Sequence, residues 1–147
     1  MNYLLDTNVV SEWVKPRPDP NVVRWLADTD EDRVYLSVIT FAEIRQGVYE
    51  MSPGRRRDSL KAWLEDDLSL RFEGRILDVN LAVAESWGSL MAQSNKMGIN
   101  LNVMDAFIAA TARVHGVTLA TRNAKHFEKL DVVLANPWAG GMGLKLG

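Results

Sequence analysis

Acidic side chains that could bind a metal ion occur at three separated places in this sequence. Asp6 follows a short apolar run, Glu43 lies near the start of a predicted helix, and Asp105 opens a markedly apolar helical stretch. Close carboxylates repel one another, and a divalent cation relieves that repulsion. A bound cation can also activate water and neutralise charge on a phosphodiester under attack. If the fold brings these acids together, they indicate metal-dependent phosphodiester hydrolysis.

Each acid also has a purely structural interpretation. Asp6 begins an Asp-Thr-Asn triplet, and all three residue types are favoured helix N-caps. Thr40 and Glu43 have the spacing of a capping box, in which Glu43 would bind the backbone N–H of Thr40. Asp105 lies three residues after Asn102, where a negative charge stabilises the start of a helix. Taken singly, these acids leave both interpretations open, and it is their joint placement that favours a functional site.

The elements that would position these acids alternate between strands and helices. Runs rich in β-branched residues predict strands, and apolar residues at helical spacing predict helices. The predicted strands cover residues 2–6, 34–39, 75–79, 117–121 and 132–135, and the predicted helices cover 9–15, 21–27, 41–51, 55–70, 81–97, 103–115 and 123–129. This alternation predicts an α/β sandwich with a parallel sheet. Because ligands bind at the carboxyl ends of parallel strands, the functional residues should lie near Asp6, Thr40 and Thr121.

Length and composition are those of one globular domain. The chain has 147 residues, of which 47% are hydrophobic and 24% are charged, and these values exclude a disordered chain, a collagen-like fibre and a coiled coil. No apolar run could span a bilayer, no signal peptide is visible and cysteine is absent. We therefore expect a cytoplasmic protein that does not contact a membrane.

The charge balance limits how the chain could bind a nucleic acid. The formal net charge is −2, whereas proteins that coat nucleic acid through charge alone are usually strongly basic. Bound cations or a local basic patch would have to supply the positive charge. Arg55-Arg56-Arg57 with Lys61 is such a cluster, and contact with an RNA backbone is one interpretation of it. Acids follow it on the same predicted helix, which favours a solvated helix face instead.

Four motifs resemble those of a known family. They read Leu4-Leu-Asp-Thr-Asn-Val-Val-Ser-Glu12, Thr40-Phe-Ala-Glu-Ile-Arg-Gln-Gly47, Asp105-Ala-Phe-Ile-Ala-Ala-Thr-Ala112 and Ala120-Thr-Arg-Asn123. Their order and spacing are similar to those of the PIN domain, and in particular to VapC toxins of type II toxin–antitoxin systems in the FitB-like branch. The resemblance implies a Rossmann-like α/β/α sandwich with a central parallel sheet of about five strands. We expect this PIN domain to span residues 1–139, and the glycine-rich C-terminal end, 140–147, to form a flexible tail.

The resemblance also implies an activity and its machinery. A VapC-like chain would be the toxic component of its system, an endoribonuclease that uses Mg²⁺, with Mn²⁺ as a substitute, to activate water against RNA phosphodiester bonds. Asp6 and Asp105 would bind the metal, and Glu43 would be the third acid. A VapB- or FitA-like antitoxin would hold the toxin inactive. The toxin would be a homodimer and could join a higher assembly on DNA through its antitoxin.

The sequence departs from the family pattern at the fourth acid. The positions where that acid is expected hold Asn123 and His126, and neither is negatively charged at neutral pH. Asn123 is a candidate catalytic residue, because its carbonyl oxygen could accept from a metal-bound water. His126 could bind Mn²⁺ but is a poor ligand for Mg²⁺, and an ordinary surface role is more common for a lone loop histidine. The departure leaves open whether one metal ion or two are bound.

Two other functions compete with the ribonuclease. The first is a catalytically impaired PIN-like module that still binds RNA or an antitoxin but has lost hydrolysis with the fourth acid. The second is a phosphatase or phospho-acceptor in which Asp6 is the nucleophile. The phosphatase pattern requires a second aspartate two residues later, and Asn8 occupies that position, so we rank this function last.

Overall fold

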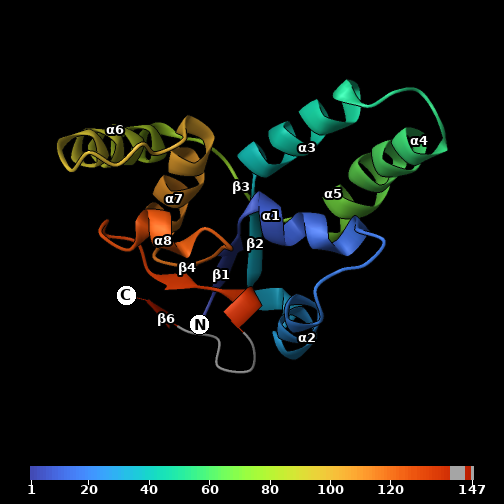
Figure 1. Ribbon diagram of the computed structural model, residues 1–147, viewed down its shortest axis with the longest axis horizontal. Helices are drawn as coiled ribbons and strands as arrows, with labels where there is room; N and C mark the ends of the chain where they lie inside the picture. Colours follow the sequence, from blue (N-terminus) through green and yellow to red (C-terminus); the bar gives the residue numbers. More distant parts are fainter. Residues whose placement is uncertain (140–144, 147) are drawn as a thin grey trace.

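A central β-sheet organises the molecule (Figure 1). The computed structural model describes residues 1–139 and 145–146. Within them the strands are β1 (Tyr3–Leu5), β2 (Val34–Ser37), β3 (Ile76–Leu77), β4 (Thr118–Ala120), β5 (Leu134–Ala135) and β6 (Lys145–Leu146). Their order is β3-β2-β1-β4-β5-β6, with β1 to β5 parallel and β6 antiparallel to β5. The predicted parallel sheet of five strands is confirmed, and a short antiparallel strand extends its edge.

Helical segments connect the strands. They are α1 (Thr7–Val10), η1 (Ser11–Val14), α2 (Pro20–Asp28), η2 (Glu31–Arg33), α3 (Val38–Glu50), α4 (Arg55–Ala62), the π-helical segment η3 (Trp63–Leu68), α5 (Ser69–Arg71), α6 (Leu81–Lys96), α7 (Val103–His115), α8 (Ala124–Phe127) and η4 (Pro137–Ala139). Gly98 and Gly116 follow α6 and α7 with φ of 70° and 63°, a left-handed conformation that glycine adopts without steric cost. The predicted helices at 81–97 and 103–115 are therefore confirmed. The predicted flexible tail lies mostly outside the described residues.

Two apolar layers hold the helices against the sheet. Successive side chains of a strand point to opposite faces, so Leu4 and Leu5 of β1 are both fully buried but lie in different layers. The layer around Leu4 is formed with α6, α7 and α8, and the layer around Leu5 with α1, α2 and η3 (Figure 1). In the part of the chain that the structure describes, no helix has the length and apolar character needed to cross a membrane.

The start of α3 differs from the prediction. The sequence pattern extends the strand to Ile39 and places the helix N-cap at Thr40, but β2 ends at Ser37 and α3 begins at Val38. Ser37 is the N-cap, because its Oγ accepts the N–H of Ile39 at 3.0 Å. Val38 and Ile39 are β-branched and favour strands, but the serine cap outweighs that preference. The predicted capping box between Thr40 and Glu43 is therefore wrong.

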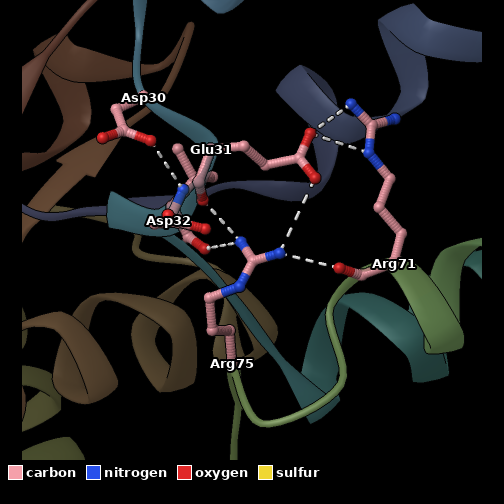
Figure 2. Close-up of polar contacts among 6 residues, drawn as sticks. Asp30, Glu31, Asp32, Arg71 and Arg75 are labelled. Atoms are coloured by element: carbon pink, nitrogen blue, oxygen red, sulfur yellow. Dashed lines mark hydrogen bonds and ion pairs between the residues drawn. The ribbon is translucent and has the colours of Figure 1, made fainter.

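An arginine joins the segment before β2 to the end of α5 (Figure 2). The guanidinium of Arg75 donates to the backbone carbonyls of Glu31 at 2.6 Å, Val34 at 2.7 Å and Arg71 at 2.7 Å. The side chain of Glu31 accepts from Arg71 Nε at 2.9 Å. The Arg75 guanidinium also lies 4.6 Å from the centroid of the Phe72 ring. A single planar cation thus satisfies three carbonyls that flank β2 and α5.

Replacing Arg75 by Ala is expected to lower the free energy of unfolding by about 2–3 kcal/mol, because three carbonyls lose their donor. The Arg75 side chain is only 17% exposed, so water cannot fully replace it. Equilibrium urea denaturation measures the change. The control is Arg24→Ala, at an exposed position on α2, which should shift stability by no more than about 0.5 kcal/mol. Equal losses in the two variants would show that the carbonyl contacts do not stabilise the fold.

Candidate active site

Asp6 lies at the carboxyl end of β1, with its carboxylate turned into the protein. Its backbone N–H donates to Ala120 O at 2.9 Å, which continues the pairing of β1 with β4. The side chain is 3% exposed. Its Oδ1 accepts the N–H of Thr7 at 2.7 Å, and its Oδ2 accepts Thr121 Oγ1–H at 2.6 Å and Asn8 Nδ2–H at 3.3 Å. The predicted N-cap role is confirmed, but the cap uses only one of the two carboxylate oxygens.

Burial dominates the ionisation of Asp6. The pKa is raised from 3.8 to about 6: burial raises it most, the hydrogen bond from Thr121 lowers it, and the charge of Asp105 raises it. A carboxylate this deep would normally be held ionised by a basic partner. Among the residues that the structure describes, no ion pair involves Asp6. Its donors are neutral hydroxyl and amide groups, which orient the carboxylate without neutralising it.

Glu43 reaches the site from α3. Its Oε1 accepts Thr7 Oγ1–H at 2.7 Å, and Thr7 Oγ1 also lies 3.0 Å from Thr40 Oγ1. Burial raises the pKa of Glu43, the hydrogen bond from Thr7 lowers it, and the charge of Asp6 raises it. Glu43 is thus hydrogen-bonded to Thr7, the residue after Asp6, and not to the backbone N–H of Thr40. This hydrogen bond places the Glu43 carboxylate at the site.

Asp105 reaches the site from the first turn of α7. Asn102 is the N-cap of that helix, since its Oδ1 accepts the backbone N–H groups of Met104 at 2.9 Å and Asp105 at 3.2 Å. The predicted N-cap at Asn102 is therefore confirmed, and the carboxylate of Asp105 takes no part in it. Burial raises the pKa of Asp105, the charge of Glu43 raises it further, and the charge of His126 lowers it.

The fold therefore brings the three predicted acids into one electrostatic group. Asp105 raises the pKa of Asp6, Asp6 raises that of Glu43, and Glu43 raises that of Asp105. The described residues contain no group of three or more His, Asp or Glu side chains already close enough to hold a metal ion together. Three carboxylates that repel one another and form no ion pair in the described part of the chain are what an added cation would stabilise.

The loop between β4 and α8 is bound to the Asp6-Thr7-Asn8 triplet. Thr121 is fully buried and donates to Asp6, and its Oγ1 accepts the N–H of Asn123 at 3.0 Å. The backbone N–H of Arg122 donates to Asn8 Oδ1 at 3.3 Å. The sequence pattern places Thr121 at a strand end but assigns it no role. A hydroxyl residue at the end of an apolar strand, close to the predicted site, is the sequence feature that could have indicated this role.

Asn123 is connected to the site by its backbone N–H, which donates to Thr121 Oγ1. It precedes α8 but makes no side-chain cap hydrogen bond, and in the described residues its side chain has no hydrogen-bond partner. The structure thus brings Asn123 near Asp6 through Thr121, while its catalytic role stays a prediction.

Replacing Thr121 by Val is expected to reduce the RNA cleavage that the sequence motifs predict about ten-fold at pH 7. The Thr121 hydroxyl lowers the pKa of Asp6, so its removal raises that pKa and leaves more of the carboxyl protonated. The deficit should therefore shrink as the pH is raised to about 8.5. A pH–rate profile measures this effect, and Thr121→Ser, which keeps the hydroxyl, should restore the wild-type profile. An unchanged acidic limb in Thr121→Val would show that this hydrogen bond does not control Asp6.

The basic cluster is partly used for structure. Arg56 Nη2 donates to Val14 O at 2.7 Å, and Arg57 Nε donates to Val48 O at 3.2 Å. These two hydrogen bonds connect α4 to η1 and to α3. The exposure of Arg55, Arg56 and Lys61 agrees with the predicted solvated helix face. Arg56 and Arg57, however, bind carbonyls of neighbouring elements and not acids of their own helix.

Known proteins share this fold and its motifs. The PIN domain family model matches residues 3–133. Over 135 residues the chain is 40% identical to Toxin FitB of Neisseria gonorrhoeae, covering 92% of this chain and 97% of FitB. It is 39% identical over 135 residues to VapC ribonuclease Y4jK of Sinorhizobium fredii, covering 92% and 96%. The solved structure of FitAB bound to an IR36 DNA fragment matches with a TM-score of 0.87 and 39% identity, covering 92% and 95%.

These matches confirm what the four sequence motifs and the parallel sheet implied. Each match covers more than nine-tenths of this chain and of the similar protein, so the similarity extends over the whole domain. The chain belongs to the PIN-domain family and, within it, to the VapC toxin ribonucleases of type II toxin–antitoxin systems.

Proposed function

We propose that this ribonuclease hydrolyses RNA phosphodiester bonds with Mg²⁺, for which Mn²⁺ can substitute, held by Asp6 and Asp105 with Glu43 as the third acid. The observation that carries this proposal is the mutual repulsion of the three carboxylates at the carboxyl edge of the sheet. Each raises the pKa of another, and no ion pair in the described residues neutralises any of them. VapC ribonucleases belong to a family that is generally metal-dependent, which agrees with this arrangement.

The donor set fits Mg²⁺ even though no three acids of the described residues are already in contact. Mg²⁺ usually keeps several waters and binds through one or two carboxylates plus phosphate oxygens of the substrate, not through a complete cage of protein ligands. Asp6 and Asp105 supply two such carboxylates. The cation would also offset the repulsion of RNA phosphates by this acidic site in a chain of net charge −2.

The residues around the acids hold them in place for this work. Thr121 and Asn8 donate hydrogen bonds to Asp6 Oδ2, and Thr7 donates one to Glu43 Oε1. These bonds orient the two carboxylates. When bound, the metal ion would supply Lewis-acid activation of water and neutralisation of charge on the scissile phosphate. Asn123 would orient the attacking water through its side-chain carbonyl, in place of the fourth acid.

Partners follow from the same proposal. We infer that a VapB- or FitA-like antitoxin blocks this site in the cytoplasm and that the toxin works as a homodimer. The FitAB structure is bound to DNA, and an antitoxin that binds DNA would recruit this chain into a similar assembly. RNA is the remaining partner, as the similarity to VapC ribonucleases implies.

Cleavage of a structured RNA tests the proposal. We expect fragments with Mg²⁺ or Mn²⁺ and none with EDTA, and we expect Glu43→Gln and Asp105→Asn to lose cleavage. Asp66→Asn, at an exposed acid of η3, is the matched control and should cleave like the wild type. Folded wild-type protein that binds RNA but does not cleave it with either metal would instead support the catalytically impaired binding module.

A further inference from the structure

We propose that Arg122 is a substrate-binding residue of this chain, whose guanidinium binds an RNA phosphate beside the carboxylate site while the indole ring of Trp138 holds it in position. The proposal rests on the function proposed above, because the bound strand is the RNA that enters that site. It concerns neither the metal ion nor its ligands. Three observations carry it: where the Arg122 backbone is fixed, what supports its side chain, and which donors that side chain leaves free.

The backbone of Arg122 is fixed at the edge of the carboxylate site. The preceding residue, Thr121, donates its N–H to Ala135 O at 3.0 Å and its hydroxyl to Asp6 Oδ2 at 2.6 Å. The N–H of Arg122 itself donates to Asn8 Oδ1 at 3.3 Å. Arg122 is therefore held one residue away from a side chain that contacts the Asp6 carboxylate directly.

Trp138 supports the side chain of Arg122. The guanidinium carbon lies 5.5 Å from the centroid of the Trp138 ring, within the range of a cation–π contact. Trp138 follows β5, which pairs with β4, so both residues come after the same carboxyl edge of the sheet. Its N–H donates to Asn136 Oδ1 at 2.9 Å, its carbonyl accepts from Asn21 Nδ2 at 3.3 Å, and its ring packs against the layer around Leu5. The guanidinium thus rests on a support that is part of the fold.

The free donors of Arg122 distinguish it from the other arginines that lie over aromatic rings. In the described residues these arginines are Arg45, Arg71, Arg75 and Arg122. The guanidinium groups of the first three also donate hydrogen bonds to a carboxylate or to a backbone carbonyl. The guanidinium of Arg122 forms no hydrogen bond or ion pair within the same part of the chain, and the residue is exposed. A cation–π contact needs no N–H donor, so the planar set of donors remains available to a ligand.

A phosphate of an RNA strand is the ligand that these donors fit. A guanidinium binds two phosphate oxygens through parallel N–H···O bonds. Arg122 forms no ion pair with the acids of the site, so its charge remains available for the strand. In a chain of net charge −2, this exposed cation gives RNA a favourable contact that the acids cannot provide. Because the guanidinium lies over Trp138 and not against the acids, the phosphate that it binds is a neighbour of the scissile one.

Salt-dependent RNA binding tests the role of Arg122. A short, fluorescently labelled single-stranded RNA is titrated with Asp6→Asn protein in EDTA, where we expect no cleavage, at about 50 to 200 mM salt. Adding Arg122→Gln should weaken binding about ten-fold and reduce the slope of log Kd against log salt by about 0.7, the value for one phosphate contact. The matched control is Arg33→Gln. It removes the same charge at an exposed position before β2, at the opposite edge of the sheet, and should leave both quantities unchanged.

A double-mutant comparison tests the positioning role of Trp138. We expect Trp138→Leu to weaken RNA binding about three-fold and Trp138→Phe, which keeps an aromatic ring, to restore most of the affinity. In the Arg122→Gln protein, Trp138→Leu should have no further effect. A ring that acts only on the fold would weaken binding equally in both proteins, and such additive losses would overturn the role of Trp138.

The outcomes for Arg122 separate this proposal from the proposed function. An Arg122→Gln protein with unchanged affinity and slope, or with a loss no larger than that of Arg33→Gln, would overturn the proposal and leave metal-dependent cleavage standing. Failure of the Asp6→Asn protein to bind RNA would also overturn it. RNA binding with the expected change of slope, but without cleavage by the wild type in Mg²⁺ or Mn²⁺, would support Arg122 and contradict the proposed function.

Discussion

Replacing Asp6 by Asn is expected to reduce RNA cleavage by about a thousand-fold and, at about pH 8 without divalent metal, to make the protein more stable. The loss of cleavage follows because the neutral amide of the variant cannot hold the cation that contributes several kcal/mol to the transition state. The gain in stability follows because the wild type buries an ionised carboxylate. Raising the pKa of Asp6 from 3.8 to about 6 corresponds to about 3 kcal/mol above pH 6.

The Asp6→Asn variant keeps most of the surrounding hydrogen bonds. Its side-chain oxygen can accept the N–H of Thr7, and its amide can donate to Thr121, whose hydroxyl can turn to accept. The expected gain is therefore about 1–3 kcal/mol, measured by urea denaturation with EDTA. Cleavage is measured on the same preparation, with Asp66→Asn as the control for both quantities. An Asp6→Asn protein that cleaves normally would remove Asp6 from the mechanism.

The second large effect is a pH dependence of stability that metal ions suppress. Without divalent metal, Asp6 should cost the native state about 3 kcal/mol, a cost that develops between about pH 4 and pH 7. In that range the unfolded chain releases the Asp6 proton while the native protein retains it. The free energy of unfolding must therefore fall as the pH rises toward and through the native pKa. Burial also raises the pKa values of Glu43 and Asp105, which adds to the same trend.

Comparison with Asp6→Asn isolates this contribution. Glu12 and Glu31 have lowered pKa values and contribute the opposite slope at lower pH, but they do so equally in both proteins. The difference in unfolding free energy between wild type and variant should grow in favour of the variant from about pH 4 to pH 7. Saturating Mg²⁺ at about pH 7.5 should raise the melting temperature of the wild type and not that of Asp6→Asn. A constant difference across the pH range would contradict the burial of an ionised Asp6.

Much of this site was readable from the sequence because its parts obey local rules. The Asp-Thr-Asn triplet after an apolar run placed Asp6 at a strand end, and Asn102 with Asp105 marked a capped helix start. Parallel strands share one carboxyl edge, so these local features predicted a common location. Gly98 and Gly116 likewise marked the ends of α6 and α7, since each has a positive φ that suits glycine.

Other features depend on contacts that sequence spacing does not encode. The cap at Ser37 displaced the predicted cap at Thr40, because two β-branched residues concealed the start of α3. The bond from Thr121 to Asp6 joins residues 115 positions apart, and the pairing of β1 with β4 creates it. The π-helical segment η3 within a predicted uniform helix is a third example. Hydrophobic periodicity reveals neither which of two hydroxyl residues caps a helix nor a hydrogen bond that strand pairing creates.

Binding of a divalent cation by Asp6 and Asp105 is central to the proposed mechanism, and a crystal structure with Mn²⁺ tests it most directly. Crystals grown at about pH 7.5, above the pKa of about 6 of Asp6, with excess Mn²⁺ would be measured for anomalous scattering. We expect an anomalous peak bound by the carboxylates of Asp6 and Asp105, and no such peak in Asp6→Asn crystals grown identically. A peak confined to other side chains, or no peak beside these acids in the wild type, would contradict the proposed mechanism.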